Sequence, residues 1–185
     1  MEGAILLIMG AIMKRTARQG CCVGDSPPLP RCCCMLRDNS GMFTPSQEDV
    51  RRFFCGVHRK QQTGEPLDAL ETLAGQWIER HPEYHADLAD ADAAVARVYE
   101  VQEGRENPFL HLSMHLSISE QCSIDQPRGI RQAVELLAAR RDSIHQAHHE
   151  TMECLGRMVW ESQRSGRPPD GAAYIDEVQR RATRD

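Results

Sequence analysis

The segment that begins at Asn107-Pro108 constrains the fold more than any other part of the sequence. Asparagine is a common helix N-cap and proline fits the first helical turn, so this pair predicts a helix start. The apolar residues that follow point in nearly every direction around that helix: Phe109, Leu110, Leu112, Met114, Leu116 and Ile118. A helix that is hydrophobic all round must be covered by other elements. We therefore expect a buried central helix over 107–122.

Helix signals recur along the rest of the chain from Thr44 onward. Thr44-Pro45-Ser46-Gln47 predicts a capping box and a first helix over 45–61. Further amphipathic patterns predict helices from Leu67 to His81-Pro82, around 84–96, near 128–140, over 143–164, and after Pro168-Pro169-Asp170. Strand-like alternation is nearly absent, and only 5% of the residues are aromatic. The sequence therefore predicts an all-α fold, a compact bundle of about five to six helices.

Residues 1–41 differ in character from the rest of the chain. Their apolar run over 4–13 is about half the length of a membrane span, and basic residues follow it instead of preceding it, so it predicts neither a span nor a signal peptide. A Pro-rich stretch and the triplet Cys32–Cys34 then show no periodicity. We expect 1–41 to be a disordered extension and 42–185 to be a single helical domain. Translation starting naturally at Met42 would explain the change; a flexible native tail or a cysteine-rich metal tag is the alternative.

The net charge and the positions of the cysteines restrict the binding partners and the cellular compartment that we expect. A formal net charge of −5 and a pI near 5.9 argue against a nucleic-acid binder. Outside the N-terminal stretch, Cys55, Cys122 and Cys154 stand singly in helical patterns, as expected for small core residues in a reducing cytoplasm. We thus expect a cytoplasmic protein with no nucleic-acid or membrane partner, and a protein partner or homo-oligomer stays open.

Histidine spacing is the main indication of chemistry. Six of the eight histidines form pairs four residues apart: His81/His85, His111/His115 and His145/His149. Residues at this spacing lie on one helix face, so pairs on two packed helices can offer their imidazoles to a single divalent ion such as zinc, iron or manganese. The predicted metal ligands are His111, His115, His145 and His149, with Glu153 as a fifth ligand or as a partner that orients an imidazole.

Other interpretations of these residues stay open. His81 precedes Pro82, which interrupts a regular helix, so we expect His81 to cap the carbonyl end of the second helix, and we expect His148 to point away from the site. The histidines could instead form a hydrogen-bonded network. The protein would then be a non-catalytic interaction module, docking through an exposed stripe such as Tyr174, Ile175 and Val178. No sequence motif identifies a reaction or a substrate.

Several segments resemble a family of small bacterial proteins known as domain of unknown function 1841. They are HPEYH at 81–85, NPFLHLSMHLSISEQ at 107–121, SIDQPRGIR at 123–131 and MECLGRMVWESQRSG at 152–166. The resemblance runs from about Met42 to the C-terminus. It implies a cytoplasmic helical protein of proteobacterial type, and it implies no activity, so the metal hypothesis depends on the residues alone.

Overall fold

The computed structural model describes residues 45–99 and 106–183, and within these ranges all regular structure is helical. The elements in chain order are α2 (Gln47–Thr63), α3 (Ala69–Arg80), the 3-10 helix η1 (Pro82–Tyr84), α4 (His85–Leu88), α5 (Ala91–Ala96), α6 (Pro108–Ile124), α7 (Ile130–Arg141), α8 (Ile144–Ser165) and α9 (Gly171–Thr183). This confirms the all-α fold class. The described ranges hold more helices than the five to six expected, because each of the seven helical segments indicated by the sequence is present and the one near 84–96 consists of η1, α4 and α5. The expected disorder of 1–41 lies outside the described residues.

Helix α2 begins at a reciprocal capping box. The Ser46 hydroxyl accepts from the Asp49 backbone N–H at 3.1 Å, and the Asp49 carboxylate accepts from the Ser46 N–H at 2.7 Å. The start at Gln47 lies two residues after the expected one, because Asp49 makes Ser46 the better cap. Thr44, the expected cap, lies outside the described residues.

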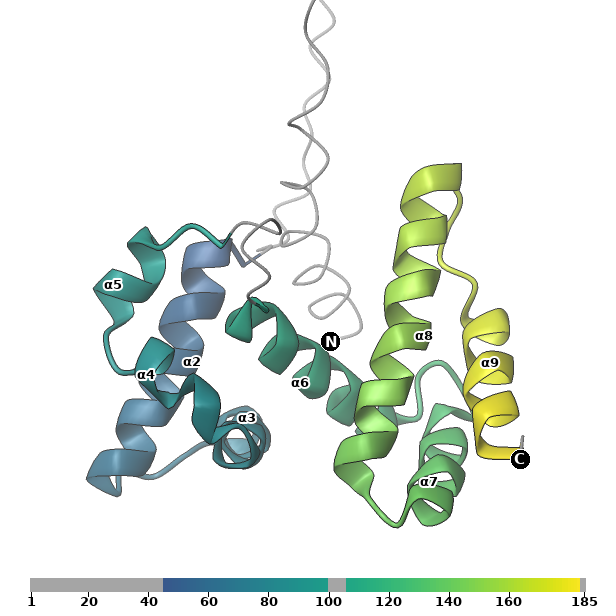
Figure 1. Cartoon of the computed structure of the whole chain (residues 1–185), viewed down its shortest axis with the longest axis horizontal. Coiled ribbons are helices and arrows are strands. Elements are labelled where there is room, and N and C mark those ends of the chain that lie inside the picture. Colours follow the sequence, from purple (N-terminus) through teal and green to yellow (C-terminus); the bar gives the residue numbers. More distant parts are fainter. Residues whose placement is uncertain (1–44, 100–105, 184–185) are drawn as a thin grey trace, which may run out of the picture.

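Helix α6 is the central helix of the molecule (Figure 1). The Asn107 side chain accepts hydrogen bonds from the backbone N–H groups of Phe109 and Leu110, at 3.1 and 3.3 Å, and so fixes the start of the helix. Leu112 and Ile118 are fully buried. The burial expected from the sequence is therefore confirmed. In Figure 1, α6 lies between α2–α5 on one side and α7–α9 on the other.

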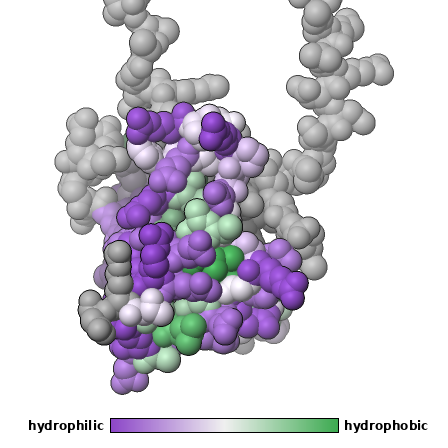
Figure 2. Space-filling view, turned by 90° about the vertical axis from the view of Figure 1, so that its right-hand side faces the viewer, coloured by the Kyte–Doolittle hydropathy of each residue, from purple (hydrophilic) through white to green (hydrophobic). Residues whose placement is uncertain are grey.

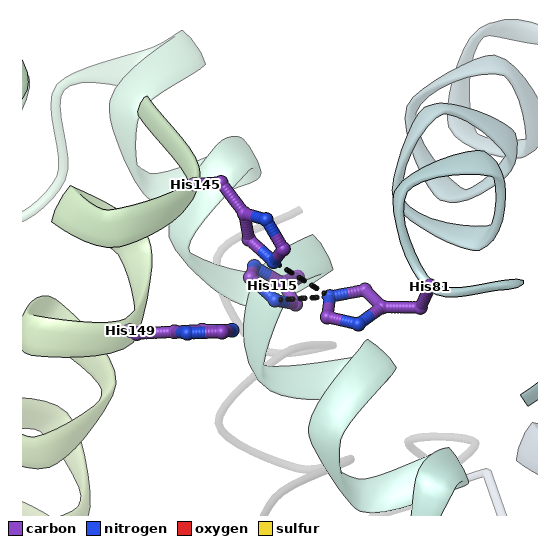
Figure 3. A group of neighbouring side chains, drawn as sticks. All are labelled: His81, His115, His145 and His149. Atoms are coloured by element: carbon purple, nitrogen blue, oxygen red, sulfur yellow. Dashed lines mark hydrogen bonds between the residues drawn. The ribbon is translucent and has the colours of Figure 1, made fainter. Parts of the chain in front are cut away.

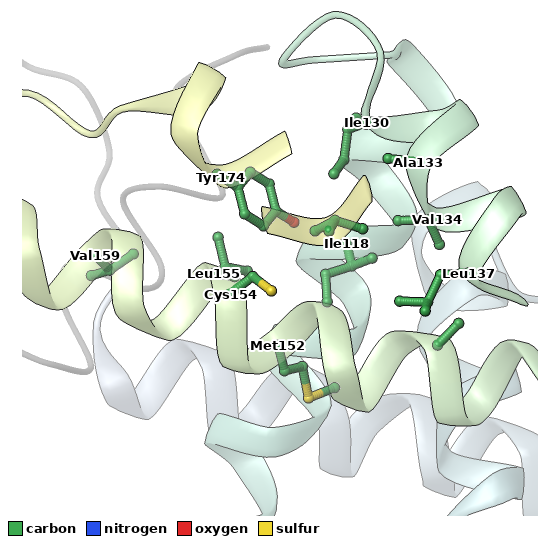
Figure 4. Close-up of a cluster of buried hydrophobic side chains, with 12 residues drawn as sticks. Ile118, Ile130, Ala133, Val134, Leu137, Met152, Cys154, Leu155, Val159 and Tyr174 are labelled. Carbon is green, nitrogen blue, oxygen red and sulfur yellow. The ribbon is translucent and has the colours of Figure 1, made fainter. Parts of the chain in front are cut away.

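Two hydrophobic cores meet at α6. The N-terminal core comprises Val50, Phe54, Cys55, Val57, Ala74, Trp77, Ile78, Leu88, Ala94, Phe109, Leu112 and Leu116. The C-terminal core, shown in Figure 4, comprises Ile118, Ile130, Ala133, Val134, Leu137, Ala147, Met152, Cys154, Leu155, Val159, Tyr174 and Val178. The first half of α6 belongs to one core and Ile118 to the other, so α6 joins the two halves.

The terminal helix packs inward. Tyr174 and Val178 are buried in the C-terminal core, and Ile175 packs against that core. Figure 2 shows that the outer face on this side is mainly hydrophilic, with small separate hydrophobic spots. The stripe considered as a docking surface is therefore used within the fold. Among the described helices, none combines the length and the apolar character that crossing a membrane requires.

Candidate metal centre

Helix α6 supplies two buried imidazoles. His111 and His115 lie one turn apart, and burial of α6 on all sides places both inside the protein, with exposed fractions of 9% and 0%. Their Nε2 atoms are 3.1 Å apart. The spacing that predicted a shared helix face thus brings the two side chains together.

Helix α8 supplies the second group of histidines. The Ser143 hydroxyl caps this helix by accepting from the Gln146 backbone N–H at 3.2 Å. His145 and His149, one turn apart, are half-buried and have ring centroids 4.5 Å apart. The His149 Nε2 lies 3.1 Å from the Nε2 of His111 on α6. The two helices therefore present their histidines to the same point.

A further imidazole comes from the end of α3. The backbone N–H of His81 donates to the Ile78 carbonyl at 3.1 Å, so His81 is the C-cap residue of α3 through its backbone, whereas its side chain contacts Glu83 and His115 and does not cap the helix carbonyls as a cation. Its side chain also enters the site, where the Nε2 lies 2.9 Å from the Nε2 of His115 and 3.0 Å from the Nε2 of His145. Sequence reasoning missed this role. His85 is directed elsewhere, because its Nε2 contacts the Ile78 carbonyl at 2.9 Å.

The five converging residues form what we call the histidine cluster: His81, His111, His115, His145 and His149. Figure 3 shows four of them pointing toward one another from α3, α6 and α8, with ligand atoms that all lie within 4.8 Å. The Nε2 of His111 extends this group, lying 3.1 Å from two of the four. The cluster sits where the two cores meet.

Spacing within the histidine cluster suits a metal ion with right-angled coordination. Nitrogen ligands about 2.0–2.1 Å from an ion stand about 2.8–3.0 Å apart at 90°, and about 3.3–3.4 Å apart at the tetrahedral angle. The four close Nε2 separations are 2.9, 3.0, 3.1 and 3.1 Å. They match the first arrangement, which is typical of five- or six-coordinate ions.

Carboxylates orient two of the imidazoles from behind. The Nδ1 of His81 lies 2.8 Å from Glu83 Oε1, and the Nδ1 of His111 lies 2.8 Å from Glu106 Oε1. Burial, the largest single cause, raises the pKa of each carboxyl, but the hydrogen bond from the imidazole, further hydrogen bonds and the nearby histidines together lower the pKa below its ordinary value. An ionised carboxylate accepts a hydrogen bond from Nδ1–H, which keeps the imidazole proton on Nδ1, so the Nε2 lone pair points into the cluster. This is the usual arrangement behind metal-bound histidine.

Two aromatic residues form the buried wall of the cluster. Trp77 stacks on His115 and also contacts His148, with ring centroids 4.3 Å apart in the second case. The Trp77 indole N–H donates to the Ser119 hydroxyl at 2.8 Å. His148, expected to point away, lies behind the cluster, with its Nδ1 3.4 Å from the Nδ1 of His115. It supports His115 from the far side of the ring.

Neutral imidazoles are favoured at this site. Burial, and then the charge of Arg80, lowers the pKa of His148 to about 3. Burial, followed by the charges of neighbouring histidines, lowers the pKa of His145 to about 4. The same two causes hold the pKa of His115 far below its usual range. Neutral imidazole is the form that ligates a metal.

Glu153 does not join the histidine cluster. It is exposed, and its carboxylate pairs with Arg181 of α9 at 2.7 Å. Each four-residue step along a helix drifts by about 40° around the axis. The stripe that starts at His145 and passes through His149 therefore turns away from α6 by the time it reaches Glu153. Its expected place as a fifth ligand is taken by His81.

Comparison of the sequence with protein-family models found a match. The family model described as a domain of unknown function, DUF1841, matches residues 46–180, which is more than half of the chain. Comparison with curated proteins and with solved structures found no match.

Proposed function

The chain belongs to the DUF1841 family, and we propose that its histidine cluster binds one divalent transition-metal ion. The observation that carries this proposal is the convergence of five Nε2 atoms from three separate helical segments. The carboxylates behind His81 and His111 support it, because they hold the Nε2 lone pairs toward the centre.

The donor set favours particular ions. An all-imidazole set suits zinc, iron, cobalt, nickel and copper, whereas magnesium and calcium prefer oxygen ligands and manganese leans toward them. Of the three ions expected from the sequence, zinc and iron fit these ligands better than manganese. The Nε2–Nε2 distances of 2.9 and 3.0 Å correspond to angles near 90° at the ion, and such angles favour an ion that accepts five or six ligands.

A hydrogen-bonded network is the alternative explanation of the same contacts. Without a metal, His115, His145 and His149 would carry Nε2 protons, and His81 and His111 would accept them. The single Nε2–H of His115 would then be shared between two acceptors. A metal ion satisfies all five lone pairs together, and this favours the metal proposal.

The position of the centre suggests what bound metal does for the fold. His81 follows α3 on the side of the N-terminal core, and His145 lies on α8 on the side of the C-terminal core. An ion held by both would cross-link the two halves in addition to their shared helix α6. We infer that metal binding stabilises the packing of the halves, as structural metals do elsewhere.

Metal analysis of the untagged protein tests the proposal. The purified full-length chain is stripped with a chelator, incubated with zinc, iron(II), cobalt or nickel at neutral pH, dialysed and analysed for bound metal. We expect about one ion per chain. A double variant, His81→Ala with His115→Ala, should retain none. Equal metal content in both proteins would assign the ion to another part of the chain and refute the proposal.

A further inference from the structure

Arg80 lies near the histidine cluster, against Trp77, and forms no ion pair with the described acidic residues. It is the last residue of α3, is exposed, and places its guanidinium 5.2 Å from the centre of the Trp77 ring, the same ring that stacks on His115. The neighbouring Glu79 turns the other way and accepts a hydrogen bond from Gln61 at 2.9 Å.

Charges around the proposed centre are distributed unevenly. The two carboxylates, Glu83 and Glu106, stand behind His81 and His111. Arg80 lies over Trp77, and the centre of the Trp77 ring is 5.9 Å from that of His145 and 4.3 Å from that of His148. A divalent ion with neutral ligands, two carboxylates and one guanidinium sums to a net charge of +1. The site as a whole therefore attracts an anion.

The histidine cluster also leaves one coordination position of the proposed ion open. The Nε2 separations of 2.9 to 3.1 Å that link the five imidazoles match neighbouring positions of an octahedron, and five imidazole ligands would leave the sixth position of a six-coordinate ion open. His145 and His149 are only half-buried, whereas His81 and His115 are buried. The solvent side of the cluster is thus the side of α8, and the Trp77 ring that Arg80 contacts lies 5.9 Å from the His145 ring of that helix.

Building on the metal centre proposed above, we propose that the protein binds a small anion, a carboxylate or phosphate group, between the metal ion and the Arg80 guanidinium. The metal would take one oxygen of the anion and the guanidinium would donate to another. A guanidinium is well suited to this role, because its planar donors match the geometry of carboxylate and phosphate oxygens. The anion would also balance the net positive charge of the site.

Cobalt-loaded full-length protein tests this inference, because the visible absorption of Co²⁺ changes when its ligands change. The probes are formate and inorganic phosphate, titrated into the wild type and into Arg80→Gln. Arg164→Gln is the matched control, since Arg164 lies over Trp160 at 5.1 Å in the same kind of contact, on the last turn of α8. We expect both anions to shift the spectrum, with dissociation constants about tenfold higher in Arg80→Gln and unchanged in Arg164→Gln.

Each other outcome overturns a defined part of the inference. If cobalt binds and neither anion changes its spectrum, the anion site is refuted and the metal centre stands. If both arginine variants bind the anions as the wild type does, the role of Arg80 is refuted. If the protein takes up neither cobalt nor any of zinc, iron(II) and nickel, the metal centre fails, and the anion site fails with it.

Discussion

Trp77 stacks on His115, with ring centroids 4.0 Å apart and only 12° between the ring planes. The chain has two tryptophans, and the other, Trp160, is about half exposed on α8. In a Trp160→Phe background, intrinsic fluorescence therefore reports on the environment of Trp77 alone. A quenching ion such as Co²⁺ or Ni²⁺ bound at His115 would lie almost in contact with the fluorophore, which provides a direct binding assay.

Replacing His81 should weaken metal binding strongly. His81→Ala removes an Nε2 that lies close to the Nε2 atoms of both His115 and His145, and we expect the Ni²⁺ dissociation constant to rise by about 100-fold or more, beyond the effect of losing an outer partner. His85→Ala is the matched control, because His85 contacts the Ile78 carbonyl instead of the cluster. Trp77 fluorescence titration measures both. Equal affinities would exclude His81 as a ligand.

The carboxylate behind His111 should tune the affinity. Glu106→Gln leaves a neutral acceptor beside the Nδ1 of His111, so we expect metal affinity to fall by about 10- to 100-fold. Glu153→Gln should leave it unchanged, because Glu153 pairs with Arg181 outside the cluster. Competition with a chelator of known affinity gives the constants. A larger effect from Glu153 than from Glu106 would contradict the geometry described above.

Acid should destabilise the metal-free protein. The pKa values of His145 and His148 in the folded state are about 4 and 3, below the ordinary value of 6.5. As the pH falls below about 6.5, the unfolded chain binds protons that the folded chain does not, so stability decreases until the pH approaches 4 to 3. Above pH 6.5 both histidines are neutral in the folded and the unfolded chain, so they do not change stability with pH. Urea midpoints at pH 7.5 and 5.5 should therefore show a lower value at pH 5.5, and an unchanged or higher midpoint would refute the expectation.

Burial of α6 predicts a large cost for truncating its core residues. Leu112 is fully buried in the N-terminal core, so Leu112→Ala should cost about 2–5 kcal/mol of unfolding free energy through lost burial and the cavity left behind. Leu136 is 49% exposed on α7, and Leu136→Ala serves as the control with a cost below about 1 kcal/mol. Urea denaturation of both variants measures the difference. Similar costs would show that α6 is not the central packed helix.

Local signals in the sequence predicted the helices and four of the five members of the histidine cluster. Asn107-Pro108 and the apolar residues after it predicted the central helix, because capping and helical periodicity depend only on nearby residues. The pairs on α6 and α8 were found by their four-residue spacing for the same reason.

The rest of the site depends on tertiary structure. The His81 side chain enters the cluster only because α3 packs against α6, and no local pattern around Pro82 reports that contact. Glu83 and Glu106 lie outside the regular α-helices and resemble ordinary surface acids in the sequence. Their positions, two residues after His81 and five before His111, were a weak signal that only the fold makes meaningful.

Anomalous scattering from crystals of the metal-loaded protein, collected at the absorption edge of the ion, tests the central claim most directly. We predict a single peak per chain, about 2.0–2.1 Å from the Nε2 atoms of the histidine cluster. A cluster that stays free of anomalous density in crystals grown with excess metal at neutral pH, or a peak held only by other residues, would contradict the account.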